Sequence, residues 1–278
     1  MGPIGIFDSG FGGLTVFREI EQRLPGYNYI YLGDNARVPY GNRSPDAIYR
    51  FTKECMETLF VHGCHLVILA CNTASAVALR RIQQQDLAHY PGQRKVLGVI
   101  RPTTEQVGRF SRTRKIGIMA TLRTVTSGSY LEEFKHYYPD LSVFQQACPM
   151  WVPLIENDDL DSPAAHHYTQ LYIRQLLEQD PEIDTVVLSC THYPLLADLI
   201  RHYLPTRIRL VGQGELVAES LEDYLSRHPE VETLCAKGGT REFLTTDDAT
   251  EFEEKGRSFY KGSLQARQIQ LSALSRHG

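Results

Sequence analysis

Short apolar runs alternate along this chain with longer segments of helical periodicity. The runs lie at about 4–7, 29–32, 66–70, 96–100, 115–119, 143–147, 185–189 and 208–211, and the helical patterns cover 44–61, 123–137, 163–179 and 214–227. Each run is short and consists mainly of β-branched or aliphatic residues, which is typical of strands buried on both faces. The alternation predicts βαβ units and therefore an α/β protein with largely parallel sheets.

Two of these runs resemble each other, and each ends in a cysteine. One leads into Cys71 and the other into Cys190, and polar residues and a helix-like segment follow both. The runs around Gly5 and Gly117 are also alike, and their offset, 117 − 5 = 112, is close to that of the two cysteines, 190 − 71 = 119. Near-equal offsets are expected from a duplication, so we predict two similar doubly wound domains.

The length of 278 residues is enough for two modest cores. After the second cysteine the chain continues with a helical pattern, a strand-like run at 233–236 and a final strand-like run at 268–271. We expect this tail to return to the first half. The predicted first domain is therefore 1–98 plus 212–278, and the second is 99–211, with the two cysteine-bearing edges facing a cleft between them.

Charge and targeting signals exclude several classes of protein. The net charge is −4 and the Lys and Arg residues are dispersed, which argues against nucleic acid as a partner. The N-terminus has neither a signal-peptide pattern nor a myristoylation pattern, so we expect a cytoplasmic protein without membrane attachment. The six cysteines form no Cys-x-x-Cys pair and are expected to be reduced. Because His62, Cys64 and His65 lack a second pair of ligands, we predict no metal site.

The two cysteines lie where open α/β sheets bind ligands, at the carboxyl ends of strands. Asn72 or Thr73 is expected to cap the next helix and to place Cys71 near its positive end, where a thiolate is favoured. His192 is close enough in sequence to assist Cys190. Two thiols in duplicated settings indicate two equivalent bases on opposite sides of one small substrate, as in a stereo-inverting enzyme.

A glycine-rich turn follows the first strand, at 8–13. A dinucleotide-binding reading fails on spacing, because the third glycine would have to stand at position 15, which is Thr15. The glycines let the backbone approach a small ligand, and amides at the helix start suit a carboxylate. The Asp8 carboxylate could bind an ammonium group or accept a proton. The alternative is that it only caps the turn that follows.

Two further segments have a plain and a functional interpretation. The segment 33–41 is a connecting loop that, at a ligand-binding edge, would bring Tyr40 and the Gly41 amide to a substrate. Glu156 is either a surface acid or the residue that orients His192.

Taken in order, four motifs resemble those of the glutamate racemases, cofactor-independent members of the aspartate/glutamate racemase superfamily. The motifs are 8–14, 39–41, 71–74 and 190–195, and the segments 120–125, 152–156 and 243–247 are also similar. The resemblance spans nearly the whole chain. It implies interconversion of L- and D-glutamate without a cofactor, a supply of D-glutamate for peptidoglycan, and a possible homodimer.

The resemblance also implies residue roles. Cys71 and Cys190 would be the two acid/base thiols, with Asp8 assisting Cys71, and with His192, supported by Glu156, assisting Cys190. The implied substrate-binding residues are Asp8, Ser9, Tyr40, Gly41, Asn72, Thr73, Thr121, Thr191 and His192. Two segments depart from the family pattern, 100–104 and 211–215, and both bear on the hinge and on any effector site.

Four alternatives to glutamate racemisation stay open. Aspartate is the runner-up substrate. A Cys-His hydrolase would use Cys190 as its nucleophile and leave Cys71 unexplained. A non-catalytic amino-acid-binding protein would tolerate serine at both positions, and a role in macromolecular interaction has no signature in these residues.

Overall fold

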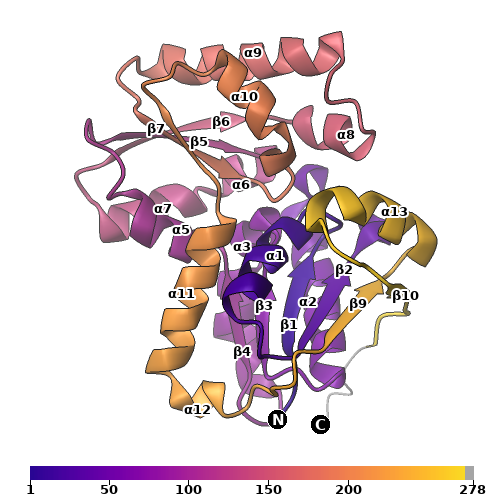
Figure 1. The fold of residues 1–278 in the computed structure, drawn as a ribbon. Coiled ribbons are helices and arrows are strands. Elements are labelled where there is room, and N and C mark those ends of the chain that lie inside the picture. Colours follow the sequence, from indigo (N-terminus) through magenta and orange to yellow (C-terminus); the bar gives the residue numbers. More distant parts are fainter. Residues whose placement is uncertain (273–278) are drawn as a thin grey trace.

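The computed structural model describes residues 1–272 and contains two separate sheets (Figure 1), in which every paired strand is parallel. The first sheet has the order β10-β9-β2-β1-β3-β4, and the second has the order β6-β5-β7-β8. The strands are β1 (Ile4–Asp8), β2 (Tyr29–Gly33), β3 (Leu66–Leu69), β4 (Lys95–Gly98), β5 (Lys115–Ala120), β6 (Ser142–Ala147), β7 (Thr185–Ser189), β8 (Arg209–Val211), β9 (Arg241–Thr245) and β10 (Ala266–Gln268). The predicted α/β class with two parallel sheets is confirmed.

Helices connect the strands and cover the sheets. They are α1 (Leu14–Arg23), α2 (Pro45–Val61), α3 (Asn72–Val77), α4 (Leu79–Arg81), α5 (Ile100–Val107), α6 (Leu122–Ser127), α7 (Ser129–Tyr137), α8 (Trp151–Glu156), α9 (Pro163–Gln179), α10 (Ala197–Tyr203), α11 (Gly214–Arg227), α12 (Pro229–Glu232) and α13 (Ala249–Tyr260), with short turns η1 (Asn35–Arg37), η2 (Tyr40–Asn42), η3 (Ile82–Asp86), η4 (Leu87–His89) and η5 (Tyr193–Leu196). No helix within residues 1–272 is long and apolar enough to cross a membrane.

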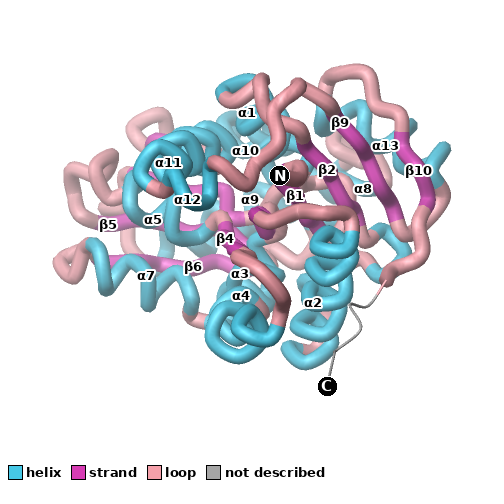
Figure 2. Tube along the Cα trace, turned by 90° about the horizontal axis from the view of Figure 1, so that it is seen from below, coloured by secondary structure: helices cyan, strands magenta, loops and turns pink. Residues whose placement is uncertain are grey.

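Figure 2 shows α1 and α2 on opposite faces of the first sheet. Alternate residues of its central strand supply two cores: Ile6 packs in the cluster on the α1 side, and Phe7 packs in the cluster on the α2 side. Every residue of β1 is buried, because both faces of the strand are covered. This double covering explains the continuous apolar character of the sequence runs.

Some predicted elements differ from the structure. The helical pattern at 123–137 forms two helices, because Gly128 adopts φ 71° and ends α6 before α7 begins. The strand β9 was not predicted, and β10 begins two residues before the predicted run at 268–271. The run at 233–236 forms only a single bridge, from Gly2 to Cys235. Residues 273–278 of the predicted first domain lie outside the described residues.

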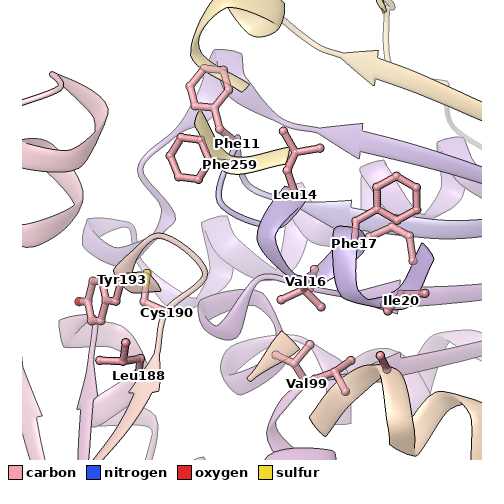
Figure 3. Packing of buried hydrophobic residues seen from close by; sticks show 14 of the residues in the cluster. Phe11, Leu14, Val16, Phe17, Ile20, Val99, Leu188, Cys190, Tyr193 and Phe259 are labelled. Atoms are coloured by element: carbon pink, nitrogen blue, oxygen red, sulfur yellow. The ribbon is translucent and has the colours of Figure 1, made fainter. Parts of the chain in front are cut away.

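The chain passes between the sheets twice. It leaves the first sheet after β4 through α5, and it returns after β8 through residues 211–214 into α11, which packs against α1 and α5. Figure 1 shows α11 running from the second sheet along the first. One apolar cluster joins the two parts: Figure 3 shows Phe11 and Phe259 beside each other, and Leu188, Cys190 and Tyr193 from the second sheet belong to the same cluster.

Candidate active site

The two matching cysteines line one cavity between the sheets. Cys71 follows β3 and Cys190 follows β7, and they are only 4% and 6% exposed. Eight other predicted site residues line the same cavity: Ser9, Tyr40, Gly41, Asn72, Thr73, Thr121, Thr191 and His192. Asp8 and Glu156 lie one contact away, behind Thr191 and His192.

Cys71 directly precedes α3 and caps its N-terminus. The backbone N–H of Ala74 donates to the Cys71 Sγ at 3.4 Å, so the cap is the thiol itself and the prediction of Asn72 or Thr73 as the cap is wrong. The Ser9 hydroxyl lies 3.4 Å from the same sulfur. Burial and the charge of Asp8 raise the pKa of the Cys71 thiol to about 12, although the two contacts at the sulfur lower it. Cys71 is therefore a proton donor at neutral pH.

Cys190 has a histidine beside it. The sulfur lies 3.9 Å from the Nδ1 of His192, and the Nε2 of His192 lies 3.0 Å from the Oε1 of Glu156. Burial alone would lower the pKa of His192, but the hydrogen bonds and charges of Cys190 and Glu156 outweigh it and raise the pKa to about 10. His192 thus holds a proton between a sulfur and a carboxylate. The two thiols have different proton-transfer partners although their strands are alike.

Asp8 is fully buried behind the cavity. Its Oδ2 accepts a hydrogen bond from the Gly10 amide at 3.0 Å, and its Oδ1 accepts one from Thr191 at 3.4 Å. Burial raises the pKa of Asp8, while the charge of His192 lowers it. Within residues 1–272 no hydrogen bond joins Asp8 to Cys71, and the contact at that sulfur comes from Ser9 instead.

The loop after β2 approaches the second sheet closely. A Cβ on Gly41 would lie 3.0 Å from the Cβ of Thr121, so the missing side chain allows this approach. The Thr121 hydroxyl also lies 3.0 Å from that of Thr73. The Tyr40 hydroxyl donates to the buried carboxylate of Asp34, which leaves the backbone and ring of Tyr40 to line the cavity.

Some residues of the site were missed in the sequence. Asp34 holds Tyr40, and Cys148, Val152 and Pro153 line the cavity. Asp34 had a usable signal, because it directly follows a buried strand at the ligand-binding edge. The other three follow β6 or lie in α8, and their apolar character gave no sign of a lining position.

The cavity between the thiols is small. Its volume is about 40 Å³, whereas typical ligand pockets have roughly 300–1,000 Å³. A larger cavity of about 680 Å³ lies between α4, α5, α7 and α11, and neither thiol lines it. Among residues 1–272 no three His, Cys, Asp or Glu side chains are grouped as metal ligands would be. The small cavity is lined by both thiols and His192, and it is too small for a ligand of typical size.

Known proteins resemble this chain over almost its full length. The model of the Asp/Glu/hydantoin racemase family matches residues 4–220. A glutamate racemase of Sulfurihydrogenibium sp. (strain YO3AOP1) is 37% identical over 273 residues, which covers 98% of each chain. The crystal structure of a glutamate racemase isoform from Bacillus anthracis has a TM-score of 0.88 at 30% identity, with 98% of this chain and 99% of that chain covered.

A second solved structure, a glutamate racemase from Francisella tularensis in complex with D-glutamate, has a TM-score of 0.85 at 27% identity and covers 97% of this chain and 98% of that chain. The family model, the long alignment and the shared fold agree with one another. This chain therefore belongs to the Asp/Glu/hydantoin racemase family, among the glutamate racemases.

Proposed function

We propose that this chain interconverts L- and D-glutamate by proton transfer between two cysteine thiols and the α-carbon. The observation that carries the proposal is the placement of Cys71 and Cys190 at equivalent strand ends of two sheets, lining one cavity. A base and an acid on opposite faces of the α-carbon invert its configuration, and exchanging the two roles runs the reaction backwards.

The surroundings of the two thiols suggest how the protons move. In one direction the Cys190 sulfur removes the α-hydrogen as a proton, and the bonding electron pair passes into the substrate carboxylate. The Cys71 thiol then gives its proton to the other face of the α-carbon. Cys190 ends as the thiol and Cys71 as the thiolate. The substrate of opposite configuration restores the starting state.

The removal of the α-hydrogen is the difficult step, because this hydrogen is weakly acidic. Positioned proton transfer typically contributes only about 10²–10⁴-fold. Neutral hydrogen-bond donors aimed at the developing negative charge supply a larger share. Ser9, Asn72 and Thr73 line the cavity and suit this task, because they can donate to an enolate-like carboxylate without protonating it.

Opening and closing of the cavity accompany turnover in this proposal. The units that move in this proposal are residues 1–98 with 212–272, and residues 99–211. The division of the strands between the two sheets supports this choice. From the resemblance to the family we also propose that the chain forms a homodimer, lies in the cytoplasm and supplies D-glutamate for peptidoglycan. Light scattering of the purified chain tests the first of these.

The test is isotope exchange in D₂O with each enantiomer of glutamate and no added cofactor. We expect inversion with one solvent deuterium at the α-carbon. Cys71→Ser and Cys190→Ser should each lower the rate of inversion about 10²–10⁴-fold. Cys235→Ser is the matched control, because this buried thiol lies outside the cavity and donates only to the Val231 carbonyl, which a serine can also do.

Other results would replace the proposal. Inversion of aspartate but not glutamate would make the substrate aspartate. A covalent thioester on Cys190, seen by mass spectrometry, would indicate a hydrolase or acyltransferase. Binding of glutamate without exchange in either enantiomer would leave an amino-acid-binding protein.

A further inference from the structure

Four buried polar side chains form a hydrogen-bonded cluster behind the cavity. The side-chain amide of Gln213 lies at its centre. Its Oε1 accepts from the Nδ2 of Asn72 at 2.6 Å, and its Nε2 donates to the hydroxyls of Thr103 at 2.8 Å and Tyr130 at 2.7 Å. All four residues are at most 3% exposed. A buried hydrogen-bonded cluster of this kind fixes its members strongly.

The cluster connects both crossings between the sheets to the residue after a catalytic thiol. Thr103 lies on α5, in the first crossing, and Gln213 lies in the second crossing, directly before α11. Asn72 follows Cys71 and lines the cavity. Both crossing residues come from the segments 100–104 and 211–215, which depart from the family pattern. The departures therefore form one structural unit.

The direction of each hydrogen bond can be worked out from one end of the cluster. The Thr103 hydroxyl donates its single proton to the Val99 carbonyl at 2.7 Å, so it can only accept from Gln213. The Tyr130 hydroxyl donates its single proton to the Oδ1 of Asn72 at 2.7 Å, so it also accepts from Gln213. Both N–H groups of Gln213 are then used.

This assignment also fixes the amide of Asn72. Its Oδ1 must face the Tyr130 hydroxyl, and one N–H of its Nδ2 must face the Oε1 of Gln213. A flipped Asn72 amide would place two oxygens against each other at Gln213, which is unfavourable in a buried site. The cluster uses one of the two N–H groups of Asn72, and the other is available to the cavity that this residue lines.

We propose that Gln213 is a positioning residue, which orients the Asn72 amide so that one N–H can donate to the substrate carboxylate. Because Gln213 in the second crossing bonds to Thr103 in the first, this orientation depends on the two crossings staying packed together. The inference rests on the proposed racemase function. Because the donor acts on charge that develops during proton removal, its loss lowers kcat more than it raises KM.

The test compares Gln213→Met with Gln106→Met. Gln106 is the matched control, because its Nε2 also joins α5 to α11, by donating to the Leu216 carbonyl at 3.0 Å. Within residues 1–272 no hydrogen bond joins it to Asn72. We expect Gln213→Met to lower kcat for both enantiomers about 10- to 100-fold, the loss typical of a misplaced group. Gln106→Met should keep kcat within about twofold, because neither Gln106 nor Leu216 lines the cavity of the two thiols.

A double-mutant cycle separates positioning from general stability. In an Asn72→Ala background, Gln213→Met should change kcat by less than about twofold, because the group that it orients is gone. Tyr130→Phe, which removes only one hydroxyl, should likewise lower kcat in the wild-type background and change it by less than about twofold in the Asn72→Ala background. If Gln213→Met does not fold, judged by its far-ultraviolet circular dichroism, the Tyr130→Phe cycle alone decides.

Two results overturn the inference while leaving the function intact: equal losses of kcat in Gln213→Met and Gln106→Met, or the same loss from the tested variant with and without Asn72. A wild-type chain that inverts neither enantiomer of glutamate overturns the proposed function, and the positioning role falls with it. Wild-type activity measured in the same assay therefore distinguishes the two failures.

Discussion

A methyl group on Gly12 should prevent the cavity from closing. Gly12 stands in the turn after β1, and a Cβ at this position would lie 2.4 Å from the Nδ1 of His192 and 2.4 Å from the Oγ1 of Thr191, both on the second-sheet side. Real Cβ atoms essentially never come within 3.0 Å of other heavy atoms. The backbone of Gly12 has no positive φ, so alanine fits the turn and the clash lies only across the cavity.

The size of the effect follows from these distances. Ordinary contact begins at 3.4 Å, so His192 must move by 3.4 − 2.4 = 1.0 Å. His192 cannot absorb this shift alone, because Glu156 holds its Nε2 at 3.0 Å and Cys190 lies 3.9 Å from its Nδ1. A misplacement of about 1 Å can cost about 100-fold in rate. We therefore expect Gly12→Ala to lower kcat/KM about 100-fold while the chain stays folded.

Circular dichroism of glutamate follows the reaction in both directions, and urea unfolding followed by tryptophan fluorescence measures stability. Gly26→Ala is the control, because no atom lies within 4 Å of a Cβ at that position. A Gly12→Ala enzyme with near wild-type kcat/KM would refute the reasoning, since it would show that His192 and Thr191 need not approach the turn. A large loss of stability in Gly12→Ala alone would show that the clash acts on folding instead.

Three further predictions concern ionisation, loop support and the core. The stabilisation that protonated His192 gives the fold is fully present below its ordinary pKa of 6.5 and is lost as the pH rises through about 10. Because Glu156 helps to raise the pKa of His192, Glu156→Gln should lower that pKa and move the alkaline limb of the kcat/KM profile to lower pH. An unchanged pH profile would contradict this. Asp34→Asn removes a buried carboxylate that accepts from Tyr40 and should lower the free energy of unfolding by about 2–3 kcal/mol in urea titrations. Ile6→Ala, in the centre of the first sheet, should cost about 2–5 kcal/mol in the same measurement, and a cost below that range would mean that the core refills the space.

Local sequence patterns predicted those elements whose signals are themselves local. The helices α9 and α11 begin and end where the periodicity does. The start of α9 also has a local signal, because Ser162 caps the helix by accepting from the Ala165 amide and Pro163 occupies the first helical position. The strand β9 was missed because it opens with Arg241 and Glu242, and its place between β2 and β10 depends on pairing with distant residues. Pairing over such a separation leaves no periodic signal.

In the site, too, some residues could be predicted from local sequence patterns and others could not. The two thiols follow apolar runs, so their position at strand ends could be predicted from the sequence. The cluster around Gln213 could not, because its four members come from α3, α5, α7 and the start of α11, and only the packing of these helices brings them together. Segments 100–104 and 211–215 were noted only as departures from a pattern. Gln213 hydrogen-bonds to both Thr103 and Asn72, and these bonds give the two segments a common structural role.

Because the two thiols are buried, the rate at which they are alkylated reports how often the cavity opens. All six cysteines are free and buried, and Cys71 and Cys190 line a cavity of about 40 Å³. A bulky alkylating reagent can reach these two sulfurs only during an excursion to the open form, so at high reagent concentration the labelling rate approaches the rate of opening itself. Mass spectrometry of the labelled cysteines would then measure the rate of cavity opening without reference to catalytic turnover.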